Sequence, residues 1–281
     1  MPDILIFVHY FGKCAKSRQL IDFSLDNGAW LIEDAAHCLL PEGNIGNSGD
    51  FVIYSPHKLL PIPDGGLLII RPDGPSNILR DPLEVSNFQE LYHSILTDSD
   101  RYDISTYTWV VKRVLQKFWI RIDKQVEFGG VEEDSPHRLP VPRMSKLAAR
   151  LLNNFVFSLN NDSVKRIENQ EVWSSCLTKV GILGRNAMLP DASYTPYLAR
   201  FSFTSSDQAE LFFALLIESN IPVTTWPDLP PEVIRNPEKH KSAIKMRNTF
   251  LYLPVHCSIS RDKVIYYTDR ISKKDNYFVR Y

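Results

Sequence analysis

The chain has 281 residues, of which 44% are hydrophobic and 23% are charged, and its formal net charge is −1 at pH 7. This length and composition predict a globular protein with one large or two smaller domains. The balanced charge argues against a nucleic-acid partner, and no apolar run is long enough for a membrane span. Four scattered cysteines without a Cys-x-x-Cys pair indicate free thiols and no metal site. The start of the chain lacks the pattern of a signal peptide, so we expect a cytoplasmic protein.

Apolar runs rich in aromatic and β-branched residues predict four short strands in the first quarter of the chain. These runs cover residues 4–10, 30–32, 51–54 and 67–70. The amphipathic stretch 16–26 predicts a helix between the first two strands, which makes them a right-handed parallel unit. Gly65-Gly66 leaves no room for a crossover helix, so we expect the last strand to run antiparallel. The pattern therefore predicts a mainly parallel α/β sheet.

Polar residues follow the second and third predicted strands at the point where each strand ends. Asp34 and His37 follow the second strand, and Ser55 and Lys58 follow the third, with Lys58 placed 24 residues after Asp34. Ligands of open α/β sheets bind beyond the carboxyl ends of the strands. Pyridoxal phosphate needs a lysine for its aldehyde and an acidic partner for its ring nitrogen. The ordered set therefore predicts a pyridoxal phosphate site.

Each of these residues also has a simpler interpretation when it is taken alone. An aspartate after a strand is usually a turn residue, and a single exposed lysine is nearly always a solvated charge. His37 and His57 are, taken singly, more often structural than catalytic. The combination in one short stretch is what favours the cofactor interpretation.

This stretch resembles the DegT/DnrJ/EryC1/StrS family of sugar aminotransferases, which have the type I pyridoxal phosphate fold. The shared motifs are Glu33-Asp34-Ala35-Ala36-His37, Gly46-Asn47-Ser48-Gly49-Asp50, Ser55, Lys58 and Gly65-Gly66. The resemblance implies that Asp34 faces the pyridine nitrogen, Ser55 binds the phosphate and Lys58 forms the Schiff base. His37 stands where the family usually has glutamine, beside the ring hydroxyl.

The middle of the chain predicts helices separated by irregular stretches. Helical patterns cover residues 88–96, 107–124, 143–157 and 162–180, with a loop at 129–142. Residues 140–149 resemble a family segment whose asparagine reaches the phosphate in the neighbouring subunit, and that asparagine falls on Val141. The family's phosphate-binding turn, which comes earlier in its sequence, has no counterpart in residues 1–30. Both observations predict weaker cofactor binding.

The last third of the chain predicts a small α+β domain. Its strands are expected at residues 194–203, 221–226 and 251–255, and its helices at 205–220 and 261–272. We expect residues 1–175 to be a remnant of the cofactor-binding large domain and residues 176–281 to form the small domain. The resemblance extends to a Leu-Pro-x-His strand end, which makes His256, together with His57, a candidate substrate contact.

Two functions remain open at this point. The first is a pyridoxal phosphate-dependent aminotransferase acting on a keto-sugar nucleotide, with an amino donor such as glutamate, in polysaccharide or secondary-metabolite sugar biosynthesis. The second is a truncated relative, inactive or dependent on a complementing N-terminal chain, that serves as a binding or scaffold protein. Type I relatives build their sites at a dimer interface, and the apolar helical face at residues 110–122 also predicts a homodimer. A lysine-free dehydratase is disfavoured because Lys58 is present.

Overall fold

The computed structural model describes residues 2–76, 104–117, 143–179, 193–226 and 228–275. Within these residues the chain divides into two compact units, the first ending at Ser163 and the second starting at Val164. A boundary between residues 175 and 176 stays a prediction. In the part of the chain that the structure describes, no helix combines the length and apolar character that crossing a membrane requires.

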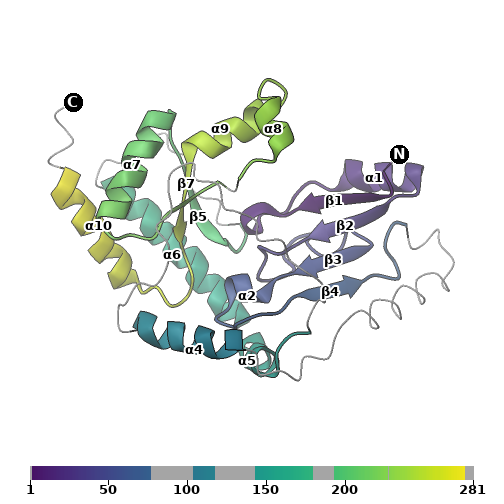
Figure 1. The fold of residues 1–281 in the computed structure, drawn as a ribbon, viewed down its shortest axis with the longest axis horizontal. Coiled ribbons are helices and arrows are strands. Elements are labelled where there is room, and N and C mark those ends of the chain that lie inside the picture. Colours follow the sequence, from purple (N-terminus) through teal and green to yellow (C-terminus); the bar gives the residue numbers. More distant parts are fainter. Residues whose placement is uncertain (1, 77–103, 118–142, 180–192, 227, 276–281) are drawn as a thin grey trace. The chain divides into compact units, whose positions relative to one another are not determined.

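The first unit is built on a four-stranded sheet (Figure 1). Its strands are β1 (Ile4–Val8), β2 (Trp30–Asp34), β3 (Phe51–Tyr54) and β4 (Leu67–Ile70), in that spatial order. β1, β2 and β3 run parallel, and β4 is antiparallel to β3. The predicted strands, their directions and the crossover between β1 and β2 are therefore confirmed.

The first strand ends two residues earlier than its apolar pattern predicts. After Val8 and His9, a short 3-10 turn covers Tyr10–Gly12, and inside it Phe11 adopts a left-handed conformation with φ of 59°. Such a conformation cannot continue a strand, so the prediction of a strand over residues 4–10 is wrong at its end. The aromatic residues there gave no sign of the turn, because L-residues with a Cβ rarely adopt positive φ.

Helix α1 (Arg18–Asn27) connects β1 to β2, close to the predicted range. It ends where Gly28 takes a left-handed φ of 63° and donates its N–H to the carbonyl of Ser24, which is the usual way for a helix to stop at glycine. Ser24 is the buried residue of this helix, and its hydroxyl donates to the carbonyl of Ala29 at 2.6 Å. The helix end and the start of β2 are thereby joined.

A short helix, α2 (Pro56–Leu59), follows β3 and leads into an apolar cluster with α5 (Lys146–Val156). Leu60, Ile62 and Ala148 are buried in that cluster. The hydroxyl of Ser145 accepts the N–H of Ala148 at 3.2 Å and caps α5, so the helix begins three residues later than predicted.

Helix α4 (Ile104–Lys117) occupies the described part of the helix predicted over residues 107–124. Its apolar stripe is exposed in the single chain, including Val111 at 57% and Val114 at 51%. The helix predicted at residues 88–96, the loop at 129–142 and Val141 lie outside the described residues.

The second unit combines three antiparallel strands with helices. Its elements are α6 (Leu159–Lys179), which begins in the first unit, β5 (Leu198–Ser202), α7 (Ser206–Glu218), β6 (Thr224–Thr225), α8 (Pro231–Arg235), α9 (Lys241–Thr249), β7 (Phe250–Pro254) and α10 (Arg261–Asp275). The strand order is β5-β7-β6, with both pairs antiparallel (Figure 1). The core contains Trp173, whose ring stacks on that of Tyr267 and whose Nε1 donates to the carbonyl of Pro254.

Candidate functional site at the ends of β2 and β3

Asp34 is the last residue of β2 and lies half-buried at the carboxyl edge of the sheet. Its Oδ1 accepts the backbone N–H of Ala36 at 2.8 Å, which is the turn-forming contact that an aspartate in this position often makes. This contact fixes the direction of the carboxylate just beyond the strand. Because β2 and β3 are parallel neighbours, their ends place Asp34 and Ser55 on the same edge.

Ser55 directly follows β3, and Lys58 lies in α2, the short helix that begins after Ser55. Ser55 occupies the N-cap position of α2, yet its hydroxyl does not cap that helix. Lys58 is exposed, and its backbone N–H donates to the carbonyl of Ser55 at 3.0 Å. The hydroxyl and the amine are thus held within one turn of chain.

The charges of Asp34 and Lys58 both act on His37. Burial lowers its pKa most, the positive charge of Lys58 lowers it further, and the negative charge of Asp34 opposes both, giving a pKa of about 4. Charges act on a histidine in this way only when they lie nearby. The imidazole of His37 is therefore neutral at pH 7, under the opposing influences of Lys58 and Asp34.

The two predicted substrate histidines have their own hydrogen-bond partners. His57 is exposed, and its Nδ1 donates to the carbonyl of Gly65 at 2.7 Å, so that its ring faces the return to β4. His256 belongs to the second unit, where its Nδ1 lies 2.6 Å from the hydroxyl of Ser258. Their roles toward a substrate stay predictions.

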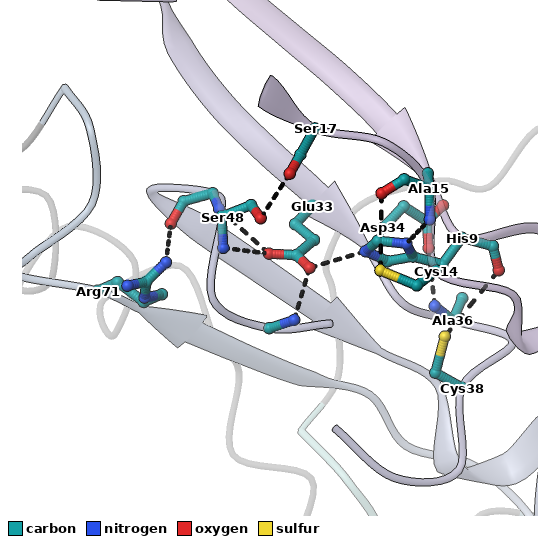
Figure 2. A network of polar contacts seen from close by, with 12 residues as sticks. His9, Cys14, Ala15, Ser17, Glu33, Asp34, Ala36, Cys38, Ser48 and Arg71 are labelled. Carbon is teal, nitrogen blue, oxygen red and sulfur yellow. Dashed lines mark hydrogen bonds and ion pairs between the residues drawn. The ribbon is translucent and has the colours of Figure 1, made fainter. Parts of the chain in front are cut away.

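A buried network lies next to Asp34 and was not predicted. Glu33 and His9 are 0% and 1% exposed, and His9 Nε2 lies 2.7 Å from Glu33 Oε1 (Figure 2). The same carboxylate accepts the backbone N–H groups of Gly46 at 2.5 Å, Ser48 at 3.0 Å and Gly49 at 3.1 Å. One side chain of β2 thus fixes the loop that leads into β3.

The protonation state of this network follows from its donors. Ala15 donates its backbone N–H to His9 Nδ1 at 2.9 Å, so Nδ1 carries a lone pair and the proton sits on Nε2, facing Glu33 (Figure 2). Burial alone would raise the pKa of the Glu33 carboxyl. The hydrogen bonds from His9 and the three backbone N–H groups outweigh burial and lower that pKa, so Glu33 is ionised.

The loop also depends on a close approach of its backbone to β2. A Cβ on Gly49 would lie 2.8 Å from the carbonyl oxygen of Phe51 and 3.0 Å from the backbone nitrogen of Glu33. The next residue, Asp50, is fully buried and accepts the N–H groups of Leu31 and Ser76, each at 2.7 Å. The Gly-x-x-Gly-Asp pattern was available in the sequence, but nothing in it identified Glu33 as the acceptor.

The described residues contain no cluster of three or more histidine, cysteine or acidic side chains arranged to hold a metal ion.

Residues 3–80 match the model of the DegT/DnrJ/EryC1/StrS aminotransferase family. The family resemblance of the motifs is confirmed for this stretch, which carries Asp34, His37, Ser55 and Lys58. No curated protein sequence matches the chain.

Solved structures of DegT/DnrJ/EryC1/StrS aminotransferases and related proteins share the fold. A DegT/DnrJ/EryC1/StrS aminotransferase from Brucella abortus is 16% identical with a TM-score of 0.57, and the match covers 95% of this chain and 63% of that one. A candidate sugar aminotransferase from Streptococcus pneumoniae, in its pyridoxal phosphate form, is 14% identical with a TM-score of 0.61, covering 98% and 69%. DesI, solved in the presence of its TDP-sugar product, is 16% identical with a TM-score of 0.55, covering 97% and 62%.

These likenesses establish the fold as that of the type I pyridoxal phosphate aminotransferases, as predicted. The chain spans only 63% of the length of the Brucella aminotransferase.

Proposed function

We propose that this chain is a pyridoxal phosphate-dependent aminotransferase-like protein that acts on a keto-sugar nucleotide. The observation that carries the proposal is the parallel pairing of β2 and β3, which brings Asp34 and Ser55 to one edge of the sheet, with the backbone N–H of Lys58 bonded to the carbonyl of Ser55. An amine for its aldehyde and a carboxylate for its ring nitrogen are the groups that this cofactor requires.

The residues present fit the cofactor. Asp34 would hold a proton on the ring nitrogen through its carboxylate, whose direction the Ala36 N–H already fixes. Ser55 would bind the phosphate with a hydroxyl that its own helix does not use as a cap. His37 would contact the ring oxygen, and Lys58 would hold the aldehyde carbon. Bound in this way, pyridoxal phosphate supplies an electron sink for a substrate carbanion.

Lys58 has two tasks in this proposal. Its amine must first lose a proton to act as a nucleophile, and later it must move a proton at the substrate carbon as a general base and acid. Lys58 is exposed and lies in the last turn of the short helix α2, so its amine is accessible for both tasks. The carboxylate of Asp34 would stabilise the positive charge on the ring nitrogen.

The keto-sugar nucleotide is the proposed substrate because DesI, a structural relative, was solved with a TDP-sugar product, and the Streptococcus protein is a candidate sugar aminotransferase. An amino donor such as glutamate completes the reaction, which would serve polysaccharide or secondary-metabolite sugar biosynthesis in the cytoplasm. His57 and His256 are the proposed substrate contacts.

A second candidate function is a relative that needs a partner for cofactor binding. The chain spans 62–63% of the length of two of its structural relatives. Apolar residues on the edge strand β1 are exposed, with Ile4 at 52% and Ile6 at 63%, as is the apolar stripe of α4. A complementing N-terminal chain and a homodimer partner are the proposed means of covering these surfaces.

The test is a titration of the full chain with pyridoxal phosphate, followed by its visible absorbance. The aminotransferase proposal expects an absorbance band that saturates and that is lost in Lys58→Arg, because the guanidinium is not a nucleophile at neutral pH. The matched control is Lys239→Arg, which removes an exposed lysine of the second unit and should leave the band unchanged. A band that survives in Lys58→Arg would overturn the role of Lys58. A band that appears only with an added N-terminal segment would favour the partner-dependent function.

A further inference from the structure

A buried aromatic residue with a left-handed backbone lies beside His37. Phe11 has φ of 59° and is 6% exposed. Residues with a Cβ avoid this conformation, which persists only where surrounding contacts impose it, and such residues gather at functional sites. The contacts of Phe11 show which residue this conformation positions.

The turn that contains Phe11 is fastened to the end of β2. The backbone N–H of His9 donates to the carbonyl of Asp34 at 2.9 Å, and Lys13 donates to the carbonyl of Tyr10 at 3.2 Å. From this fixed turn, the N–H of Phe11 donates to His37 Nδ1 at 3.3 Å. The two rings also pack against each other, with centroids 5.6 Å apart and a tilt of 35°.

This contact decides where His37 carries its proton. A nitrogen that accepts a backbone N–H must present a lone pair, so Nδ1 is unprotonated and the neutral ring carries its proton on Nε2. The pKa of about 4, lowered by burial and by Lys58 against the opposing charge of Asp34, agrees with a neutral ring. His37 is then a donor through Nε2 at pH 7.

We propose that Phe11 is a positioning residue, which holds His37 as a neutral Nε2–H donor aimed at the ring oxygen of pyridoxal phosphate. The identity of the acceptor rests on the proposed function, whereas the Phe11–His37 contact does not. Glutamine, which the family usually has at this position, donates through a side-chain amide. A histidine at this position could donate a hydrogen bond, accept one or carry a positive charge. The N–H of Phe11 favours the neutral Nε2–H form, which donates as the glutamine amide of the family would.

The tautomer can be tested on the full chain without cofactor, by nuclear magnetic resonance with ¹⁵N-labelled histidine. We expect the Nε2–H tautomer of His37 at pH 7, still neutral at about pH 5 because its pKa lies below that of a free imidazole. An Nδ1–H tautomer or an imidazolium at pH 7 would overturn the proposal.

Two substitutions of Phe11 separate its N–H from its side chain. Phe11→Gly keeps the N–H and suits the positive φ, so it should retain the tautomer. Phe11→Pro removes the N–H, so the Nε2–H tautomer of His37 should no longer be favoured. If Phe11→Pro fails to fold, hydrogen exchange of the Phe11 amide tests the Phe11–His37 contact instead. The Phe11 amide should exchange about tenfold faster in His37→Leu than in the wild type, because its acceptor is gone. An unchanged rate would reject the contact.

The donor role is tested with pyridoxal phosphate as the probe. His37→Gln keeps a donor and should bind within about threefold of the wild type, whereas His37→Leu should bind about tenfold more weakly. Equal affinities of these two variants would overturn the donor role. If His37 shows the expected tautomer and the wild type binds no cofactor, the proposed function and the donor role fail together while the positioning of His37 stands.

Discussion

Replacing Glu33 by glutamine should loosen the loop between β2 and β3. Four donors converge on the Glu33 carboxylate, from His9 and from the backbone of Gly46, Ser48 and Gly49. Glutamine keeps one carbonyl oxygen as an acceptor. It also places an amide NH₂ group among N–H donors, which leaves some of them without an acceptor in a site that is closed to water.

The magnitude follows from the number and burial of these contacts. A hydrogen bond to a charged group contributes roughly 1.5–3 kcal/mol, and removing one partner from a buried charged network costs about 3–5 kcal/mol. Since glutamine retains part of the acceptor capacity, we expect Glu33→Gln to lower the free energy of opening this region by about 3 kcal/mol, the lower end of that range. That is a large share of the roughly 5–15 kcal/mol that stabilises a typical domain.

Hydrogen exchange measures this loss at the residues concerned. The amides of Gly46, Ser48 and Gly49 should exchange roughly a hundredfold or more faster in Glu33→Gln, because each 1.4 kcal/mol is about tenfold. Glu210→Gln, a change at an exposed position on α7, is the matched control and should leave these rates unaltered. Rates in Glu33→Gln within a few fold of the wild type would refute the reasoning.

The same variant predicts a pH dependence. The pKa of Glu33 is lower in the folded chain than in the unfolded chain, so the ionised carboxylate stabilises the fold. This contribution is fully present above the unfolded pKa and is lost as the pH falls through the folded pKa. The difference in stability between the wild type and Glu33→Gln should therefore shrink in acid, and a difference that grew would contradict the assignment of the charge.

Two further predictions concern single side chains. Burial, followed by the charges of Asp34 and Glu33, raises the pKa of the Cys38 thiol to about 12, so iodoacetamide at pH 8 should leave Cys38 unlabelled in the native chain and label it after denaturation. Native labelling at the rate of Cys257 would contradict this. In the second unit, the Asn169 amide donates to the carbonyls of Val255, His256 and Ile259, so Asn169→Ala should lower the free energy of unfolding in urea by about 1–3 kcal/mol, whereas Asn160→Ala at an exposed position should not. Equal midpoints for both variants would rule out this role of Asn169.

The strands of the first unit could be predicted because each is a compact apolar run with a turn signal at its end. Their directions followed from the lengths of the connections, a helix between β1 and β2 and only Gly65-Gly66 before β4. The end of β1 could not be predicted, since the turn that contains Phe11 is held by partners 25 and 26 residues further on, His9 bonding to Asp34 and Phe11 to His37.

The second unit was harder to predict in detail. The strand expected at residues 221–226 covers only Thr224–Thr225 in the structure. The hydroxyl of Ser205 accepts the N–H of Gln208 and caps α7, so the predicted helix begins one residue later, at Ser206. Helices α8 and α9 were not predicted, because they are short and rich in charge. Where local sequence signals are this weak, tertiary packing determines whether a helix forms.

Part of the candidate site could be predicted from residue types. Asp34, Ser55 and Lys58 follow strand ends, where sheet topology brings side chains together. The Glu33 network could not be predicted, because its donors come from His9, which follows β1, and from a loop 13 to 16 residues further on, and a glutamate within a strand has no local feature that marks it as buried.

The most direct test of the central claim is to locate the covalent attachment of the cofactor. The full chain is incubated with saturating pyridoxal phosphate and reduced with borohydride, and the modified peptide is mapped by mass spectrometry. Reduction traps even a weakly held cofactor, so the measurement does not depend on tight binding. The account predicts a pyridoxyl group on Lys58, at a level that falls strongly in Asp34→Ala because the ring nitrogen loses its partner. Modification spread over exposed lysines, with no preference for Lys58 and no effect of Asp34→Ala, would contradict it.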